Sequence, residues 1–194
     1  MTSSLRLVIF TLVLAMLLGC GKYGRPMPPE HFAPRAVADL EVTAQEAKIT
    51  FAWRSPRLAD DGRELKSMEG YRLYRKTIKE QSDISDNDVE FELITTVSDT
   101  HVQVRDQLRA EARVQGKPGR KIQPPAATMK FEYSDGTVKE GETYLYKLVP
   151  INQGGVEGDP GQPITIVFKG LASKIIIAAD SSKTASTDQF DDAE

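Results

Sequence analysis

The 194-residue chain is poor in the residue types that build catalytic and metal sites, with one cysteine, two histidines and one tryptophan. A single cysteine excludes an internal disulfide and a metal site made of several thiolates. The net charge of −3 lacks the basic excess of nucleic-acid-binding proteins, so no nucleic-acid partner is expected. With 40% hydrophobic and 27% charged residues, the composition is that of a globular protein.

Long hydrophobic runs are scarce, and the longest lies at the N-terminus. LVIFTLVLAMLLG at residues 7–19 follows Arg6 and is shorter than the roughly 20 residues that a membrane-spanning helix needs. It is typical of a secretory signal. Leu17-Leu18-Gly19-Cys20 resembles the lipobox of bacterial lipoproteins. That resemblance implies a diacylglyceryl group on the Cys20 thiol, cleavage after Gly19 and an acylated new N-terminus.

Two other roles for Cys20 are open, a buried structural thiol and a nucleophile. The prolines that follow, at 26, 28 and 29, leave no helix or strand to bury it, and the chain offers only His31 and His101 as bases. Lipid attachment is the preferred interpretation, because a doubly or triply acylated chain stays in a membrane.

The segment after the cysteine is expected to be a tether. Residues 1–19 are the predicted signal peptide, and the proline-rich residues 20–35 are predicted to hold a domain off the membrane. CGKYGRPMPP also resembles the opening of small Gram-negative lipoproteins. In that group an aspartate after the cysteine signals retention in the inner membrane, so Gly21 implies the outer membrane.

From residue 36 the hydrophobic residues alternate with polar ones, as in half-buried antiparallel strands. Such patterns predict seven short strands and hence an all-β sandwich of two sheets. The stretches are 38–44, 48–54, 70–76, 90–97, 129–134, 144–148 and 164–168.

The domain at residues 36–170 resembles fibronectin type III domains of the immunoglobulin-like fold. Trp53 ends the second stretch, and MEGYRLYRK resembles the third strand with its paired tyrosines. Val138-x-x-Gly141-x-x-Tyr144 is close to the tyrosine-corner pattern, with Glu140 in place of proline. The predicted core aromatics are Trp53, Tyr71, Tyr144 and Tyr146, and the Tyr144 hydroxyl should bond a nearby backbone group. The alternative is a sugar-stacking platform that includes Tyr74.

An insertion of about residues 99–126 stands where the resemblance implies a short connection. Its first part has helical periodicity, and arginines recur at i, i+4 and i+8. One interpretation is a solvated helix that covers a sheet edge. The other is a docking surface for an acidic protein, an anionic glycan or lipid phosphates, on a loop that the fold does not need. The candidate residues are Arg105, Arg109, Arg113, Arg120 and Lys121.

Residues 171–194 form a C-terminal extension. Ile175–Ile177 is expected to extend the last strand, to add a short one, or to offer an edge to another chain. From about residue 180 the Ser/Thr/Asp-rich composition predicts disorder.

No catalytic constellation stands out, so neither an enzyme nor a cofactor is expected. His101 lies near Asp99 and Ser98, but sequence proximity is no triad. Asp60 and Asp61 could attract Ca²⁺ but are better explained as turn formers. The sequence therefore predicts a membrane-anchored lipoprotein of the cell envelope with a protein-interaction or scaffold domain. The alternative is an accessory subunit or assembly factor for an outer-membrane or polysaccharide-related complex.

Overall fold

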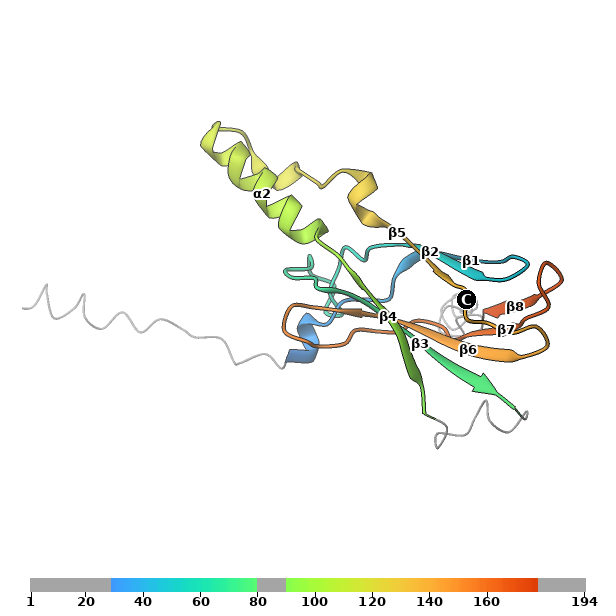
Figure 1. The fold of residues 1–194 in the computed structure, drawn as a ribbon. Helices are drawn as coiled ribbons and strands as arrows, with labels where there is room; N and C mark the ends of the chain where they lie inside the picture. The colour runs from blue at the N-terminus through green and yellow to red at the C-terminus, as the bar shows by residue number, and fades with distance from the viewer. Residues whose placement is uncertain (1–28, 80–89, 178–194) are drawn as a thin grey trace, which may run out of the picture.

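Two antiparallel β-sheets face each other, and one helix projects from one end of them (Figure 1). The computed structural model describes residues 29–79 and 90–177. The lipobox, most of the predicted tether and the tail from residue 178 lie outside these ranges. The predicted all-β sandwich with a partly helical insertion is confirmed.

The smaller sheet has the strand order β1–β2–β5, and the larger has the order β4–β3–β6–β7–β8. The smaller sheet consists of β1 (Ala38–Ala44), β2 (Ile49–Arg54) and β5 (Lys130–Asp135). The larger consists of β4 (Glu92–Ser98), β3 (Gly70–Ile78), β6 (Thr143–Ile151), β7 (Ile164–Val167) and β8 (Lys174–Ile177). Each of the seven predicted stretches contains a strand, and the isoleucine run adds β8 at the edge of the larger sheet.

The helical elements cluster at one end of the sandwich. They are the 3₁₀ turn η1 (Pro29–Phe32), α2 (His101–Val114), η3 (Gly119–Lys121) and η4 (Ala126–Met129). We call this end the arm end, because it carries the inserted segment. The loops β2–β3 and β6–β7 lie there too, whereas the tight β1–β2 and β7–β8 turns lie at the opposite end, the turn end (Figure 1).

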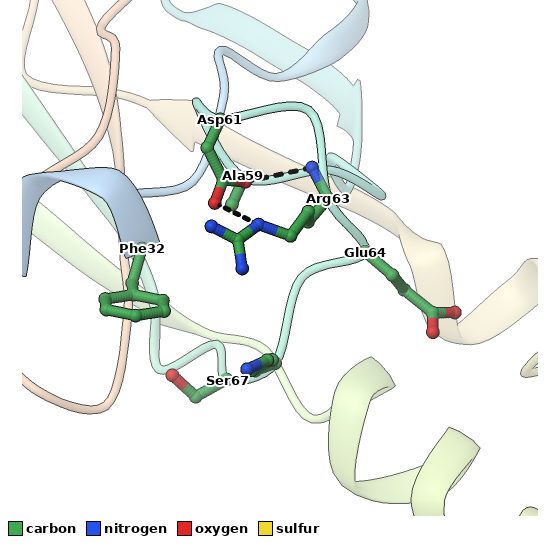
Figure 2. Close-up of a pocket in the computed structure, with 7 residues that line it drawn as sticks. Phe32, Ala59, Asp61, Arg63, Glu64 and Ser67 are labelled. Carbon is green, nitrogen blue, oxygen red and sulfur yellow. Dashed lines mark hydrogen bonds and ion pairs between the residues drawn. The ribbon is translucent and has the colours of Figure 1, made fainter. Parts of the chain in front are cut away.

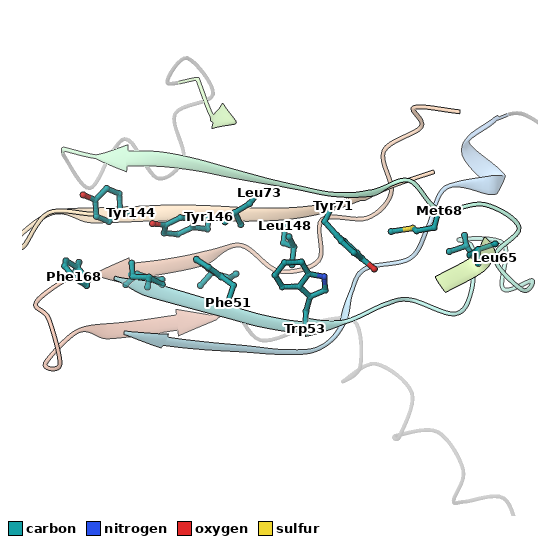
Figure 3. Packing of buried hydrophobic residues seen from close by; sticks show 14 of the residues in the cluster. Phe51, Trp53, Leu65, Met68, Tyr71, Leu73, Tyr144, Tyr146, Leu148 and Phe168 are labelled. Atoms are coloured by element: carbon teal, nitrogen blue, oxygen red, sulfur yellow. The ribbon is translucent and has the colours of Figure 1, made fainter. Parts of the chain in front are cut away.

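The core fills the space between the sheets with alternate residues of each strand (Figure 3). Trp53 is 3% exposed and meets Tyr71 edge-on, with the ring centroids 5.3 Å apart. Phe51 packs on Tyr146 in a tilted arrangement, with the ring centroids 4.8 Å apart. Tyr144 lies in the same cluster, so the four aromatics predicted for the core are all in it.

The tyrosine corner has the expected bond. The Tyr144 hydroxyl accepts a hydrogen bond from the Lys139 amide at 2.8 Å and donates one to Glu142 at 2.6 Å. Gly141 has φ of +87°, a conformation that a residue with a side chain adopts at a cost. Burial, together with the Glu142 carboxylate, raises the pKa of Tyr144 to about 12.

A buried ion pair closes the core near the turn end. Asp135 is fully buried and accepts hydrogen bonds from Arg75 at 3.0 Å and from the Tyr146 hydroxyl at 2.8 Å. Thr137 donates to the other carboxylate oxygen through its amide and its hydroxyl. Arg75 lies on the inward face of β3, in phase with Tyr71, where it neutralises this carboxylate.

Candidate functional site: a basic arm

The inserted segment folds into an arm, residues 100–125, made of α2 and a return segment that packs along it (Figure 1). The Asp99 carboxylate accepts the His101 amide at 2.8 Å, so it satisfies a backbone donor of the first turn. At the other end Gly116 has φ of +69°, and the Lys117 amide bonds back to the Ala112 carbonyl at 2.8 Å. This is a Schellman ending, and it turns the chain back along the helix.

The base of the arm is fixed by a buried polar group that we call the Asp99 cluster. The hydroxyls of Ser55 and Tyr71 donate to one oxygen of Asp99, the former at 2.6 Å. His101 Nδ1 donates to the other at 2.9 Å. All four side chains are almost fully buried. Burial alone would raise the pKa of Asp99, but the hydrogen bonds from His101, Ser55 and Tyr71 outweigh it and hold that pKa below its ordinary value.

The first half of α2 packs against the sandwich. Val102 belongs to the core cluster. Arg105 is 6% exposed, its Nη1 donates to the Leu65 carbonyl at 2.7 Å, and its Nε bonds Asp106 at 2.9 Å. The expectation that Arg105 lies on a solvated basic edge is therefore wrong, because its guanidinium is buried and donates a hydrogen bond to a carbonyl of the β2–β3 loop. The expectation that the fold does not depend on this loop also needs correction, since part of the loop is core.

Arg109 joins three pieces of chain. Its two terminal nitrogens hold the two oxygens of Glu64 at 2.8 and 2.7 Å, and its Nε donates to the Ile122 carbonyl at 3.2 Å. This pairing lowers the pKa of Glu64 and raises that of Arg109. Arg109 thus binds the β2–β3 loop, α2 and the return segment together, and its charge is neutralised within the molecule.

The far half of the arm carries the remaining positive charge, which we call the basic tip: Arg113, Lys117, Arg120 and Lys121. All four are exposed. Within residues 29–79 and 90–177, the side chains of Arg113, Arg120 and Lys121 have no hydrogen bond or ion pair, and the Lys117 ammonium bonds only the Gln115 side chain, at 2.9 Å. The chain has five basic and no acidic residues from position 112 to 131. Lys117 was not among the predicted site residues, although this run of charge contains it.

Two variants separate packing from docking. Arg105→Gln is expected to lower the free energy of unfolding by about 1.5–3 kcal/mol, because it removes charge-assisted bonds to a buried carbonyl. Arg113→Gln should change it by less than about 0.5 kcal/mol, as is usual for an exposed side chain. Urea denaturation of both variants measures this. Equal losses would contradict the division of the arm into a packed base and a free tip.

The Asp99 cluster does not have the order of a catalytic triad. Here the carboxylate lies between Ser55 and His101, whereas a triad needs the imidazole between hydroxyl and carboxylate. Asp61, considered above as a Ca²⁺ ligand, instead accepts the Arg63 amide at 2.9 Å and pairs with the Arg63 guanidinium at 2.7 Å. The described residues contain no group of three or more potential metal ligands.

A small pocket lies beside the arm between η1 and the β2–β3 loop (Figure 2). It holds about 90 Å³, room for a few waters, whereas ligand sites usually offer about 300–1,000 Å³. Phe32 and Lys66 form part of its wall, and the Glu64 side chain points away toward α2, where it meets Arg109. The arm is thus a stronger candidate site than this pocket.

Comparison with known proteins establishes neither a family nor a function for this chain. No protein-family model and no curated protein sequence matches the chain. The third fibronectin III domain of human KIAA0343 protein matches with 13% identity and a TM-score of 0.36, over 86% of this chain and 100% of that one. A Fn3-like protein from Clostridium thermocellum matches with 14% identity and a TM-score of 0.33, over 65% and 83%.

A structure of the twitchin kinase region from C. elegans matches with 8% identity and a TM-score of 0.42. That match covers 71% of this chain, which spans only 17% of the length of that structure. The identities and TM-scores are too low to carry an argument about function. The strand order itself defines an antiparallel sandwich of two sheets, with β8 at one edge of the larger sheet and the arm inserted between β4 and β5.

Proposed function

We propose that this protein is a lipoprotein of the cell envelope, anchored at Cys20, whose fibronectin type III-like domain is an interaction or scaffold module. The arm is its contact surface, and the basic tip receives an anionic partner. One observation carries the proposal: the tip presents positive charge that no described residue neutralises, on an arm that the buried Asp99 cluster and Arg105 fix to the sandwich.

The anchor rests on the sequence of residues 7–20. Among the described residues, no helix is long and apolar enough to span a bilayer. A triacylated cysteine would hold the chain at the membrane, since each buried methylene contributes about 0.8 kcal/mol and two chains already bind stably. Gly21 supports sorting to the outer membrane, by the resemblance described above.

The role that we assign is binding and not catalysis. The four basic side chains of the tip place positive charge on an open surface. The buried side chains of the Asp99 cluster bond one another and hold the arm in place. A second candidate function is that of an accessory subunit or assembly factor for an outer-membrane or polysaccharide-related complex. This second function would use the same surface, and the identity of the crosslinked partner distinguishes it from a general interaction or scaffold role.

Crosslinking in intact envelopes tests the proposal. The wild type is compared with the tip variant Arg113→Gln/Lys117→Gln/Arg120→Gln/Lys121→Gln and with a turn-end variant that loses the same charge. The turn-end variant replaces four exposed lysines, at 48, 139, 169 and 174, with glutamine. We expect the tip variant to lose the crosslinks that the wild type and the turn-end variant form. Unchanged crosslinks in the tip variant would refute the tip as the contact surface.

Cys20→Ser serves in the same experiment as the anchor variant. It should either accumulate as an uncleaved precursor or leave the membrane fraction, and it should incorporate no labelled fatty acid. A variant that still fractionates with membranes at mature size would refute the anchor.

A further inference from the structure

The predicted tether and the arm leave the sandwich at the same end. η1 is held to the β6–β7 loop, because Asn152 donates to the Phe32 carbonyl at 3.2 Å and the Asp159 amide donates to the Pro34 carbonyl at 3.2 Å. The chain therefore reaches the sandwich at the arm end, from which α2 also projects (Figure 1). An anchor at Cys20 would bring this end, and not the turn end, toward the membrane.

The tip is within reach of the surface to which the lipid is attached. Nine residues lead from Cys20 to Pro29 and span at most about 30 Å when fully extended. α2 has 14 residues and is about 21 Å long, and because its first half packs on the sandwich, only about 10 Å of it projects beyond. The span of the tether is an upper bound, so a tether that is not fully extended allows the tip to reach the membrane surface.

The chemistry of the tip fits a charged surface better than a protein pocket. It offers four cations, and Val114 beside them is 90% exposed. Protein interfaces are typically centred on buried aromatic anchors. The described part of the arm, residues 100–125, contains no aromatic side chain apart from the buried His101. Phosphate headgroups need only the cations, and one apolar residue can enter the interface between them.

We infer that the basic tip docks on anionic phospholipid headgroups of the membrane that holds Cys20. The inference rests on the proposed anchoring. Docking fixes the orientation of the sandwich, so that lipid and tip hold it at two points. The turn end then faces away from the bilayer.

The test uses the acylated full-length mature chain in vesicles, with a fluorophore at a single position. Acylation occupies the Cys20 thiol, so Val114→Cys accepts the only label, and the mass of the purified chain verifies this. Gly136→Cys is the matched control, because Gly136 is exposed next to the last residue of β5 and has room for a Cβ. Vesicles are either phosphatidylcholine alone or phosphatidylcholine with phosphatidylglycerol.

We expect the probe at 114 to shift its emission to the blue only in vesicles with phosphatidylglycerol, and the probe at 136 to shift in neither. About 1 M salt, where the Debye length falls to about 3 Å, should abolish the shift. The tip variant should lose the shift, and the turn-end variant should keep it.

Three results would overturn the inference. If the chain stays with the vesicles but the emission of the probe at 114 is the same with and without phosphatidylglycerol, headgroup docking is refuted and the anchor is not. A shift at 114 that appears only when envelope proteins are added would assign the tip to a protein. A purified chain without lipid on Cys20 that floats with neither kind of vesicle would instead refute the anchor, and with it the proposed function.

Discussion

Trp53→Ala is expected to lower the free energy of unfolding by about 3–5 kcal/mol, the usual cost of truncating a large buried aromatic. The indole packs edge-on to Tyr71 and lies nearly parallel to Phe131, with the ring centroids 5.9 Å apart. Removal of the indole leaves a cavity between the two sheets, and the packing around it cannot fully close that cavity. Since typical domains have only about 5–15 kcal/mol of stability, the urea midpoint should fall sharply.

Trp53→Phe is the matched control. The indole Nε1 is the one buried side-chain polar atom, among the described residues, that has no hydrogen-bond partner. Phenylalanine keeps an aromatic ring and removes this unsatisfied donor, so we expect it to cost less than about 1.5 kcal/mol. An unchanged midpoint in Trp53→Ala would show that the sandwich is not built around this residue.

Asp99→Ala should have the second largest effect, a loss of about 3–5 kcal/mol. The carboxylate accepts four hydrogen bonds, from Ser55, from Tyr71 and from the backbone and ring of His101. Without it these buried donors are unsatisfied, and each costs about 1–3 kcal/mol, although such costs do not add fully. Ser55→Ala, which removes one donor and leaves no buried group without a partner, should cost far less. Equal effects of the two variants would contradict the central role of the carboxylate.

The same carboxylate contributes to acid sensitivity. Because the pKa of Asp99 is lower in the folded chain than in the unfolded one, its contribution to stability is complete above about pH 4 and is lost as the pH falls through the folded pKa. Asp135 acts in the same direction: hydrogen bonds from Thr137 and Tyr146, and the charge of Arg75, outweigh its burial and lower its pKa. Asp99→Asn should therefore flatten the acid side of the stability curve, which denaturation between about pH 2 and 7 measures.

The sandwich could be predicted because each strand carries its own signal. Alternation along β2 and β6 identifies inward residues without any knowledge of the neighbouring strand. The tyrosine corner is equally local, since Tyr144 bonds an amide five residues earlier. A lone sequence contains this kind of information in full.

The division of the arm could not be predicted, because it depends on distant residues. Arg105, Arg109 and Arg113 repeat with the same spacing, and nothing in that spacing distinguishes them. What distinguishes them is contact with the β2–β3 loop. Leu65 lies 40 positions before Arg105, and Glu64 lies 45 positions before Arg109. Likewise, Ser55 and Tyr71 reach Asp99 only after β2 and β3 are placed in opposite sheets.

Amide hydrogen exchange on the full chain tests most directly whether the arm is a fixed part of the fold. We expect residues 104–112 of α2 to be protected nearly as strongly as β3 and β6, because the Asp99 cluster, Arg105 and Arg109 fix the helix to the sandwich. Asp99→Ala should reduce that protection more in α2 than in the strands. Exchange of residues 104–112 at the rate of an unstructured peptide, while β3 and β6 remain protected, would contradict the fixed arm on which the proposed docking depends.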